Sequence, residues 1–207
     1  MKWLSYLPKI NKVIEVGIAE GVLGKLDQNR NYQLVGIEIN ESWATQASNY
    51  YDKVIIGDIQ YLDKEIFNDI DCIILADVLE HLSNPSAVLN RIREFIPSEC
   101  VVILSVPNVA NLWVRINLLF GKFNYTERGI LDKTHLRFFT KSTFKKMIRD
   151  SNLEIINLDY TSIPLGLVHP FFIDNKFGMV LYKLLDFLSH RLPTLLSYQL
   201  MAYCKKV

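Results

Sequence analysis

Short apolar runs alternate with helix-like segments along the chain, and this alternation limits the possible folds more than any other feature. The runs are bounded by glycine or polar residues, as buried strands are. Strands that alternate with helices are typical of repeated βαβ units, which predicts an α/β fold with a mainly parallel sheet. The predicted strands cover residues 13–16, 34–37, 53–56, 72–75, 101–106, 153–159 and 198–205, and the predicted helices cover 22–28, 42–50, 85–95 and 141–150.

Two segments, at about 108–139 and 162–197, interrupt this alternation of strands and helices. Insertions at strand ends often cover ligands in open α/β sheets, so both segments are predicted to be lid-like. The chain has 207 residues and no obvious linker. Residues 1–207 are therefore predicted to form a single domain that includes both insertions.

Composition argues against several classes of function. The net charge is +1 and the charged residues are scattered, so no nucleic-acid partner is expected. The chain reaches Pro8 and Lys9 before a long apolar stretch forms, which argues against a secretory leader. Cys72, Cys100 and Cys204 lie far apart in apolar runs and are interpreted as small hydrophobic residues, which favours a cytoplasmic location.

The region 164–200 is rich in Leu, Phe and Tyr, but charged residues interrupt it too often for a membrane-spanning helix. It is predicted to form an amphipathic cover, with contact to a membrane surface or a partner protein as the alternative. The sequence leaves the oligomeric state open.

The stretch VIEVGIAEGVLG at 13–24 predicts a strand, a glycine turn and a helix, an arrangement that often receives a nucleotide. The dinucleotide pattern G-x-G-x-x-G would need glycine where Ala19 and Val22 stand. Glu15 and Glu20 would also repel a pyrophosphate. An NAD-dependent oxidoreductase is therefore disfavoured, and a positively charged ligand is favoured.

S-adenosylmethionine is such a ligand, because its sulfonium and ammonium groups make the methionyl end positive. The motifs EVGIAEG, VGIEIN, IIGDI and ILADVLEHLSNP follow four successive predicted strands, and in this order they resemble the class I S-adenosylmethionine-dependent methyltransferases. The segment GILDKTHLRFFT is also similar to small-molecule members of that family. The resemblance implies a Rossmann-like three-layer sandwich with a seven-stranded, mainly parallel sheet and an antiparallel last strand.

The resemblance also implies S-adenosylmethionine as the cofactor and locates its binding residues. Glu38 matches the acid that holds the ribose hydroxyls, and Asp58 matches the acid that contacts the adenine amino group. Ala19 stands where glycine is commoner, and alanine fits there if its φ is negative. The cofactor-binding residues implied in this way are Glu15, Gly17, Ala19, Gly21, Glu38, Ile39, Asp58, Ile59, Ala76 and Asp77.

Structural roles stay open for several of these acids. Glu15 could pair with Lys12 or Lys25 at the strand end. Asp58 could begin a turn, since Gly-Asp is a common turn dipeptide, and Asp77 could be an ordinary loop acid.

His81 and His135 are the candidate catalytic bases, because histidine titrates near neutral pH, although each could instead be a hydrogen-bonded structural residue. Arg137 is the candidate substrate-binding residue, unless it forms an ion pair that anchors the lid. Asp77, Glu80 and His81 could in principle hold a divalent ion. No second pair of ligands with metal spacing is evident, so no metal is predicted.

Methyl transfer from an activated cofactor needs alignment of two bound molecules and exclusion of water, which accounts for a chain without a nucleophilic serine or cysteine constellation. The sequence predicts an enzyme that methylates oxygen or nitrogen of a small molecule, such as a metabolite, a sugar or a lipid-linked intermediate. The alternative is a non-catalytic binding or scaffold subunit with the same fold.

Overall fold

The computed structural model describes residues 10–165 and 171–207 of the chain. The N-terminal residues on which the prediction about a leader rests lie outside this part, as do residues 166–170 of the second insertion.

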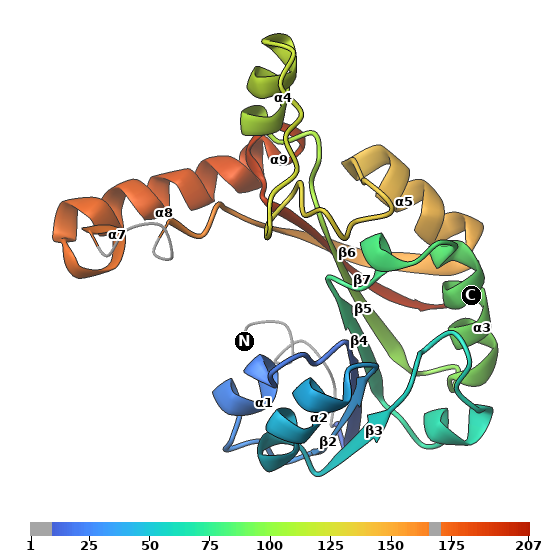
Figure 1. Cartoon of the computed structure of the whole chain (residues 1–207). Coiled ribbons are helices and arrows are strands. Elements are labelled where there is room, and N and C mark those ends of the chain that lie inside the picture. Colours follow the sequence, from blue (N-terminus) through green and yellow to red (C-terminus); the bar gives the residue numbers. More distant parts are fainter. Residues whose placement is uncertain (1–9, 166–170) are drawn as a thin grey trace.

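The described residues form one sheet of seven strands in the order β3-β2-β1-β4-β5-β7-β6 (Figure 1). Neighbouring strands from β3 to β5 are parallel, and β7 runs antiparallel to both β5 and β6. This confirms the predicted Rossmann-like sheet with an antiparallel last strand. The strands are β1 (Lys12–Val16), β2 (Gln33–Glu38), β3 (Lys53–Ile56), β4 (Cys72–Ala76), β5 (Val101–Pro107), β6 (Leu153–Thr161) and β7 (Gln199–Lys206).

The α-helices are α1 (Val22–Leu26), α2 (Glu41–Ala47), α3 (Pro85–Phe95), α4 (Leu112–Leu119), α5 (Lys141–Asp150), α7 (Phe171–Asp174), α8 (Lys176–Arg191) and α9 (Pro193–Leu196). Short 3-10 helices are η2 (Ser48–Tyr50), η3 (Lys64–Phe67) and η4 (Leu79–His81). The predicted helix at 42–50 is thus α2 followed by η2, and α1 ends at Leu26 rather than at residue 28.

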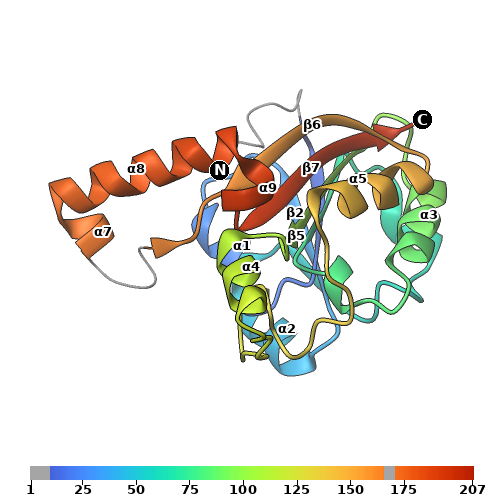
Figure 2. The same ribbon diagram turned by 90° about the horizontal axis from the view of Figure 1, so that it is seen from above.

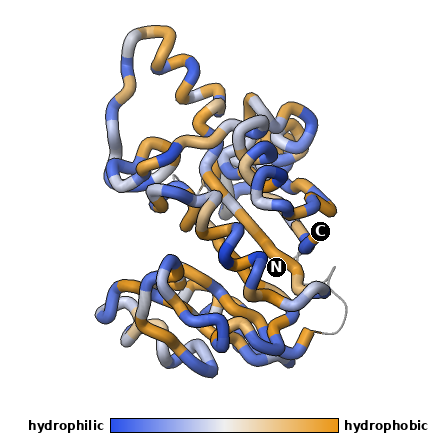
Figure 3. Tube along the Cα trace, turned by 90° about the vertical axis from the view of Figure 1, so that its right-hand side faces the viewer, coloured by the Kyte–Doolittle hydropathy of each residue, from blue (hydrophilic) through white to orange (hydrophobic). Residues whose placement is uncertain are grey.

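Helices cover both faces of the sheet because alternate strand residues point to opposite sides. Val13 packs in the cluster that contains Ala47 of α2. Its neighbour Ile14 packs in the cluster that contains Leu89 of α3 and Phe144 of α5. Figure 3 shows that hydrophobic residues are concentrated along the strands between these layers. Cys72, Cys100 and Cys204 are free and buried in this interior, as interpreted from the sequence.

Both helix start signals in the sequence have the expected geometry. Asn84 Oδ1 accepts a hydrogen bond from the Ala87 N–H at 3.1 Å at the start of α3. Thr140 and Thr143 form a reciprocal capping box at the start of α5.

Buried amides join the two predicted insertions. Asn108 and Asn111 begin the first insertion, and their Nδ2 atoms donate to the carbonyl oxygen of Ser197 at 3.0 and 2.8 Å. Both asparagines are almost fully buried. As a result, α4 and α9 lie close together at one end of the sheet (Figure 1).

Helix α8 extends away from the sheet (Figure 2). Phe177, Val180, Leu184 and Phe187 recur at helical spacing, and each is at least half exposed. This arrangement suits contact with an apolar surface through the region 164–200, which stays a prediction. Within residues 10–165 and 171–207, no helix has the length and apolar character needed to cross a membrane.

Candidate functional site

The strand order reverses between β1 and β4, which are neighbours in the sheet and lead to helices on opposite faces. Ligands of open α/β sheets bind at the carboxyl ends of strands beside such a reversal. The predicted cofactor residues lie at or near the carboxyl ends of β1, β2, β3 and β4. The fold therefore brings them to one edge of the sheet.

Two glycines shape the turn after β1. Gly17 and Gly21 have φ of 69° and 80°, a left-handed backbone that favours glycine. A Cβ atom added at Gly17 would lie 2.8 Å from Val78 Cγ2, and one added at Gly21 would lie 3.1 Å from Ala47. These positions need glycine for both backbone conformation and space.

Ala19 has a left-handed backbone. Its φ is 45°, so the condition under which alanine would fit this position, a negative φ, is not met. The turn directs the Ala19 N–H toward Glu38, whose Oε2 accepts it at 2.8 Å. A left-handed conformation costs an alanine energy that a glycine would not lose.

Glu38 is 4% exposed at the end of β2, and its Oε1 accepts from the Asn40 N–H at 2.9 Å. Each carboxylate oxygen accepts one hydrogen bond within the protein and has capacity for a second, so two ribose hydroxyls could still be held. The adjacent Ile39 side chain is 67% exposed and could contact an adenine ring.

Asp58 and Ile59 follow β3 but differ in what they can offer a ligand. The Asp58 carboxylate accepts from the Gln60 N–H and from Gln60 Nε2, at 2.9 and 3.0 Å, so it stabilises a turn as its structural alternative predicts. The Ile59 side chain is only 6% exposed and packs in the core, which leaves mainly its backbone for a ligand. Ala76 ends β4 and is half-buried.

Glu15 has a different partner from those considered in the sequence. The Tyr51 hydroxyl donates to its carboxylate, while Lys12 Nζ bonds to the Asn68 carbonyl and Lys25 lies over the ring of Tyr50. Burial raises the pKa of Glu15 to about 7, and the hydrogen bond from Tyr51 opposes part of this rise.

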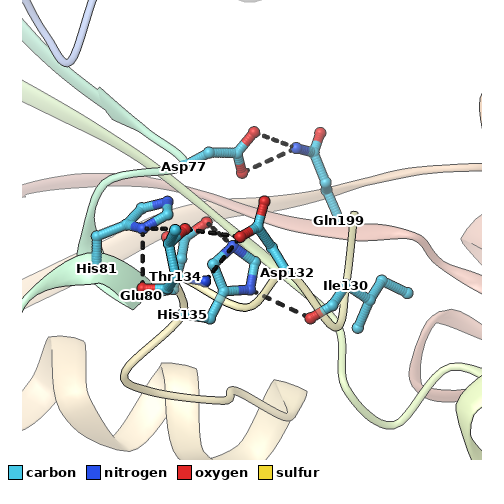
Figure 4. A network of polar contacts seen from close by, with 8 residues as sticks. All are labelled: Asp77, Glu80, His81, Ile130, Asp132, Thr134, His135 and Gln199. Carbon is cyan, nitrogen blue, oxygen red and sulfur yellow. Dashed lines mark hydrogen bonds and ion pairs between the residues drawn. The ribbon is translucent and has the colours of Figure 1, made fainter. Parts of the chain in front are cut away.

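Asp77 follows β4 with a φ of 54°. Gln199 Nε2, at the start of β7, donates to both of its carboxylate oxygens at 2.9 and 2.6 Å (Figure 4). Burial raises the pKa of Asp77, and the hydrogen bond from Gln199 opposes part of the rise. This loop acid is therefore held in a defined orientation at the candidate site.

Beside Asp77, the structure brings Glu80 and His81 of η4 together with His135 of the first insertion (Figure 4). The His81 and His135 ring centroids are 4.8 Å apart, and His135 Nε2 lies 3.9 Å from Glu80 Oε1. The Glu80 carbonyl oxygen accepts from the N–H groups of Leu136 and Arg137 at 2.8 and 3.0 Å, which fastens the insertion to η4. The two predicted catalytic histidines are thus neighbours.

Hydrogen bonds define the tautomer of each histidine. His135 Nδ1 lies 3.2 Å from the Ile130 carbonyl oxygen, which can only accept. His81 Nδ1 lies near the carbonyl and hydroxyl oxygens of Thr134, and that hydroxyl donates its proton to Asp132. Both Nδ1 atoms therefore carry the proton, and both Nε2 atoms keep a lone pair.

Glu80 and His135 have shifted pKa values in opposite directions. Burial raises the pKa of the Glu80 carboxyl to about 9, and the nearby charge of Asp77 adds to the rise. Burial lowers the pKa of His135. Both groups therefore favour their neutral forms in the free protein.

Arg137 anchors the insertion rather than standing free. Its Nε and Nη2 atoms donate to the Ser83 carbonyl oxygen at 3.1 and 2.5 Å. The anchoring role considered for Arg137 is the one seen, with a backbone carbonyl in place of an acidic side chain.

Sequence reasoning missed several residues that shape the site: Tyr51, Gln199, Asp132 and Thr134. Tyr51 and Gln199 lie far in sequence from the acids that they orient, and no local motif marks them. Asp132 and Thr134 lie within the segment GILDKTHLRFFT, but the contact of Thr134 with His81 spans 53 positions of the chain. The environment of Glu80 was also missed, although its motif was recognised.

Residues 2–158 match the family model described as Methyltransferase domain. The chain belongs to this methyltransferase family. Its membership confirms the resemblance to the class I S-adenosylmethionine-dependent methyltransferases, together with the predicted enzyme class and S-adenosylmethionine as the cofactor. A comparison with curated proteins found no match.

Solved structures show the same fold. An S-adenosylmethionine-dependent methyltransferase from Archaeoglobus fulgidus aligns with a TM-score of 0.66 at 15% identity, over 99% of this chain and 90% of that chain. The magnesium protoporphyrin IX methyltransferase of Synechocystis PCC 6803, with bound S-adenosylhomocysteine, aligns with a TM-score of 0.61 at 16% identity. This alignment covers 100% of this chain and 79% of that chain. A putative methyltransferase in complex with the Haloferax volcanii Trm112 methyltransferase activator aligns with a TM-score of 0.61 at 16% identity. This alignment covers 98% of this chain and 85% of that chain.

Proposed function

We propose that this methyltransferase transfers the methyl group of S-adenosylmethionine to an oxygen or nitrogen atom of a small, partly apolar acceptor. The observation that carries the proposal is the order of the site residues across the sheet. Asp58 follows β3, Glu38 ends β2, Gly17 follows β1 and Asp77 follows β4. With adenosine over β3 and β2 and the methionyl end over β1, the transferable methyl group would face the side chains that follow β4.

Those side chains support acid–base chemistry at the acceptor. His81 Nε2 and His135 Nε2 keep a lone pair because each Nδ1 proton is used elsewhere. The acceptor atom attacks the methyl carbon in line with the carbon–sulfur bond, and the bonding electrons stay on sulfur. Where the acceptor is a hydroxyl or a protonated amine, one of these Nε2 atoms would take the proton.

Aromatic side chains beside His135 support a partly apolar acceptor. Phe138 lies 6.3 Å from the His135 ring and 5.7 Å from the Phe123 ring, measured between centroids, and Tyr125 packs on Phe123 at 5.6 Å. Tyr125 is 58% exposed, so a ligand could reach this group.

Calorimetry with S-adenosylmethionine, S-adenosylhomocysteine and NAD tests the cofactor site. We expect the two adenosyl compounds to bind and NAD not to bind. Glu38→Ala should weaken the binding of S-adenosylhomocysteine at least about tenfold, since a carboxylate bonded to two hydroxyls contributes more than about 1.4 kcal/mol. The matched control is Glu94→Ala, an exposed acid on α3, which should bind as the wild type does.

Two results would contradict this assignment. Unchanged affinity in folded Glu38→Ala would remove the ribose role, and binding of NAD alone would remove the cofactor site. Cofactor binding without turnover across a broad screen of hydroxyl and amine acceptors would favour the non-catalytic subunit instead.

A further inference from the structure

Three potential metal ligands meet in the candidate site. One carboxylate oxygen of Glu80, one ring nitrogen of His81 and one of His135 all lie within 4.8 Å of one another (Figure 4). Ligands of a tetrahedral ion with bonds of about 2.0–2.2 Å are roughly 3.4 Å apart. Side-chain rotations that bring the three atoms up to about 1.4 Å closer would therefore complete the geometry.

The environment of Glu80 gives a second, independent indication of a missing cation. The side chain is 1% exposed, and neither carboxylate oxygen receives a hydrogen bond from any described residue. A buried carboxyl without a partner is costly, and unpaired buried polar atoms call for an explanation. A cation held between Glu80 and the two imidazoles would give the buried carboxylate a partner.

The histidines are oriented as metal ligands usually are. A metal-bound imidazole donates its other N–H to a carbonyl or carboxylate, which directs the free lone pair at the ion. Here Ile130 and Thr134 accept from the Nδ1 atoms, and Asp132 in turn accepts from the Thr134 hydroxyl. Backbone hydrogen bonds to the Glu80 carbonyl hold His135 beside η4 although the two are distant in sequence.

We propose that Glu80, His81 and His135 bind one divalent transition-metal ion, with zinc as the best match. Two imidazoles and one carboxylate suit zinc, and a fourth position would stay open for an exchangeable ligand. Mg²⁺ and Ca²⁺ prefer oxygen ligands and fit this donor set poorly. The sequence showed no further ligand at metal spacing beside Glu80 and His81. The fold supplies one, because it brings His135 to these two residues.

The ion would favour an acceptor that has a hydroxyl group. This part of the inference rests on the proposed function. An acceptor hydroxyl bound at the open position would lose its proton to solvent water more readily. The resulting oxygen anion would attack the methyl carbon as the carbon–sulfur bond breaks, which gives a methyl ether and S-adenosylhomocysteine. An Nε2 atom bound to metal cannot also take a proton, so activation by the ion would replace a histidine base.

The test is a titration of the purified full-length chain, freed of metal with a chelator, with Co²⁺. Visible absorption of bound Co²⁺ reports its coordination. We expect saturation at one equivalent and displacement by Zn²⁺. Glu80→Gln, which removes a buried carboxyl without changing its shape, and His135→Asn should each weaken Co²⁺ binding at least about 100-fold. His190→Asn and Glu154→Gln, at an exposed histidine and an exposed glutamate outside the site, are the matched controls.

No Co²⁺ or Zn²⁺ binding by the wild-type chain would overturn the inference, as would wild-type binding by both Glu80→Gln and His135→Asn. Thermal melts confirm that the variants are folded. S-adenosylhomocysteine binding is measured separately, without metal. Co²⁺ binding without S-adenosylhomocysteine binding would retain the metal site and reject the proposed function, and the reverse result would reject only the metal site.

Discussion

At the scale of single residues, we expect Glu15 to make cofactor binding depend on pH. Its pKa is about 7 in the folded, free protein, against 4.5 for an ordinary glutamate, because burial disfavours its charge. The stability that goes with this raised pKa is therefore fully present below pH 4.5 and is lost as pH rises through about 7. A positively charged methionyl end nearby would favour the ionised form, so affinity should rise with pH over the same range.

Glu15→Gln should remove this pH dependence. We expect the affinity of the wild type for S-adenosylmethionine to increase several-fold between about pH 6 and pH 8, and that of the variant to stay nearly constant, because glutamine does not titrate. Calorimetry at four pH values measures both profiles, with Glu94→Gln as a control that keeps the wild-type profile. Parallel profiles for wild type and Glu15→Gln would show that another group is responsible.

Ala19 carries backbone strain at a φ of 45°. Ala19→Gly should raise the free energy of unfolding by up to about 1 kcal/mol, because relief of the left-handed strain exceeds the added flexibility of the unfolded chain. Urea denaturation gives the value. The same change in an ordinary helix, Ala87→Gly in α3, should lower stability by about 0.5–1 kcal/mol. A loss of stability in both variants would contradict the strain at residue 19.

At the scale of elements, the joint between the two insertions depends on Asn108. Its Nδ2 donates to the carbonyl of Ser197, and its Oδ1 accepts from the Ala110 N–H at 3.1 Å. Asn108→Ala would leave the buried Ala110 N–H without its partner and would leave Asn111 as the remaining amide donor to the Ser197 carbonyl. We therefore expect a loss of about 2 kcal/mol in urea denaturation. Asn117→Ala in α4 should change stability by less than about 0.5 kcal/mol, because its amide bonds to a carbonyl on the helix surface. Equal effects would show that Asn108 does not hold the joint.

Elements with strong local signals were the easier ones to predict. β3 (Lys53–Ile56) and α3 (Pro85–Phe95) have the predicted bounds, since the apolar pattern and the caps act within each segment. Helix α4 was not predicted, because it exposes apolar side chains and has no clear amphipathic pattern. Its position depends on distant partners such as Ser197, which no local pattern contains.

At the scale of the whole molecule, cofactor binding should stabilise the folded chain. S-adenosylhomocysteine at about 100 times its dissociation constant adds about 2.7 kcal/mol, which corresponds to a rise in Tm of roughly 5–10 °C for a chain of this length. Thermal melts with and without the ligand measure the shift, and NAD at the same concentration should leave Tm unchanged. A shift with NAD but none with S-adenosylhomocysteine would contradict the site described above.

The sequence alone determined the α/β class, the strand positions, the family and the cofactor, because each depends on patterns within a few residues: apolar runs, Gly17 and Gly21 in a turn, and acids at strand ends. Tertiary structure decided what those residues contact. It brought His135 to Glu80 across 55 positions of chain. It also placed the Tyr51 hydroxyl where it donates a hydrogen bond to Glu15, and it set the left-handed φ of Ala19. These features arise from burial and from hydrogen bonds between distant segments, which exist only once the sheet and its insertions have packed.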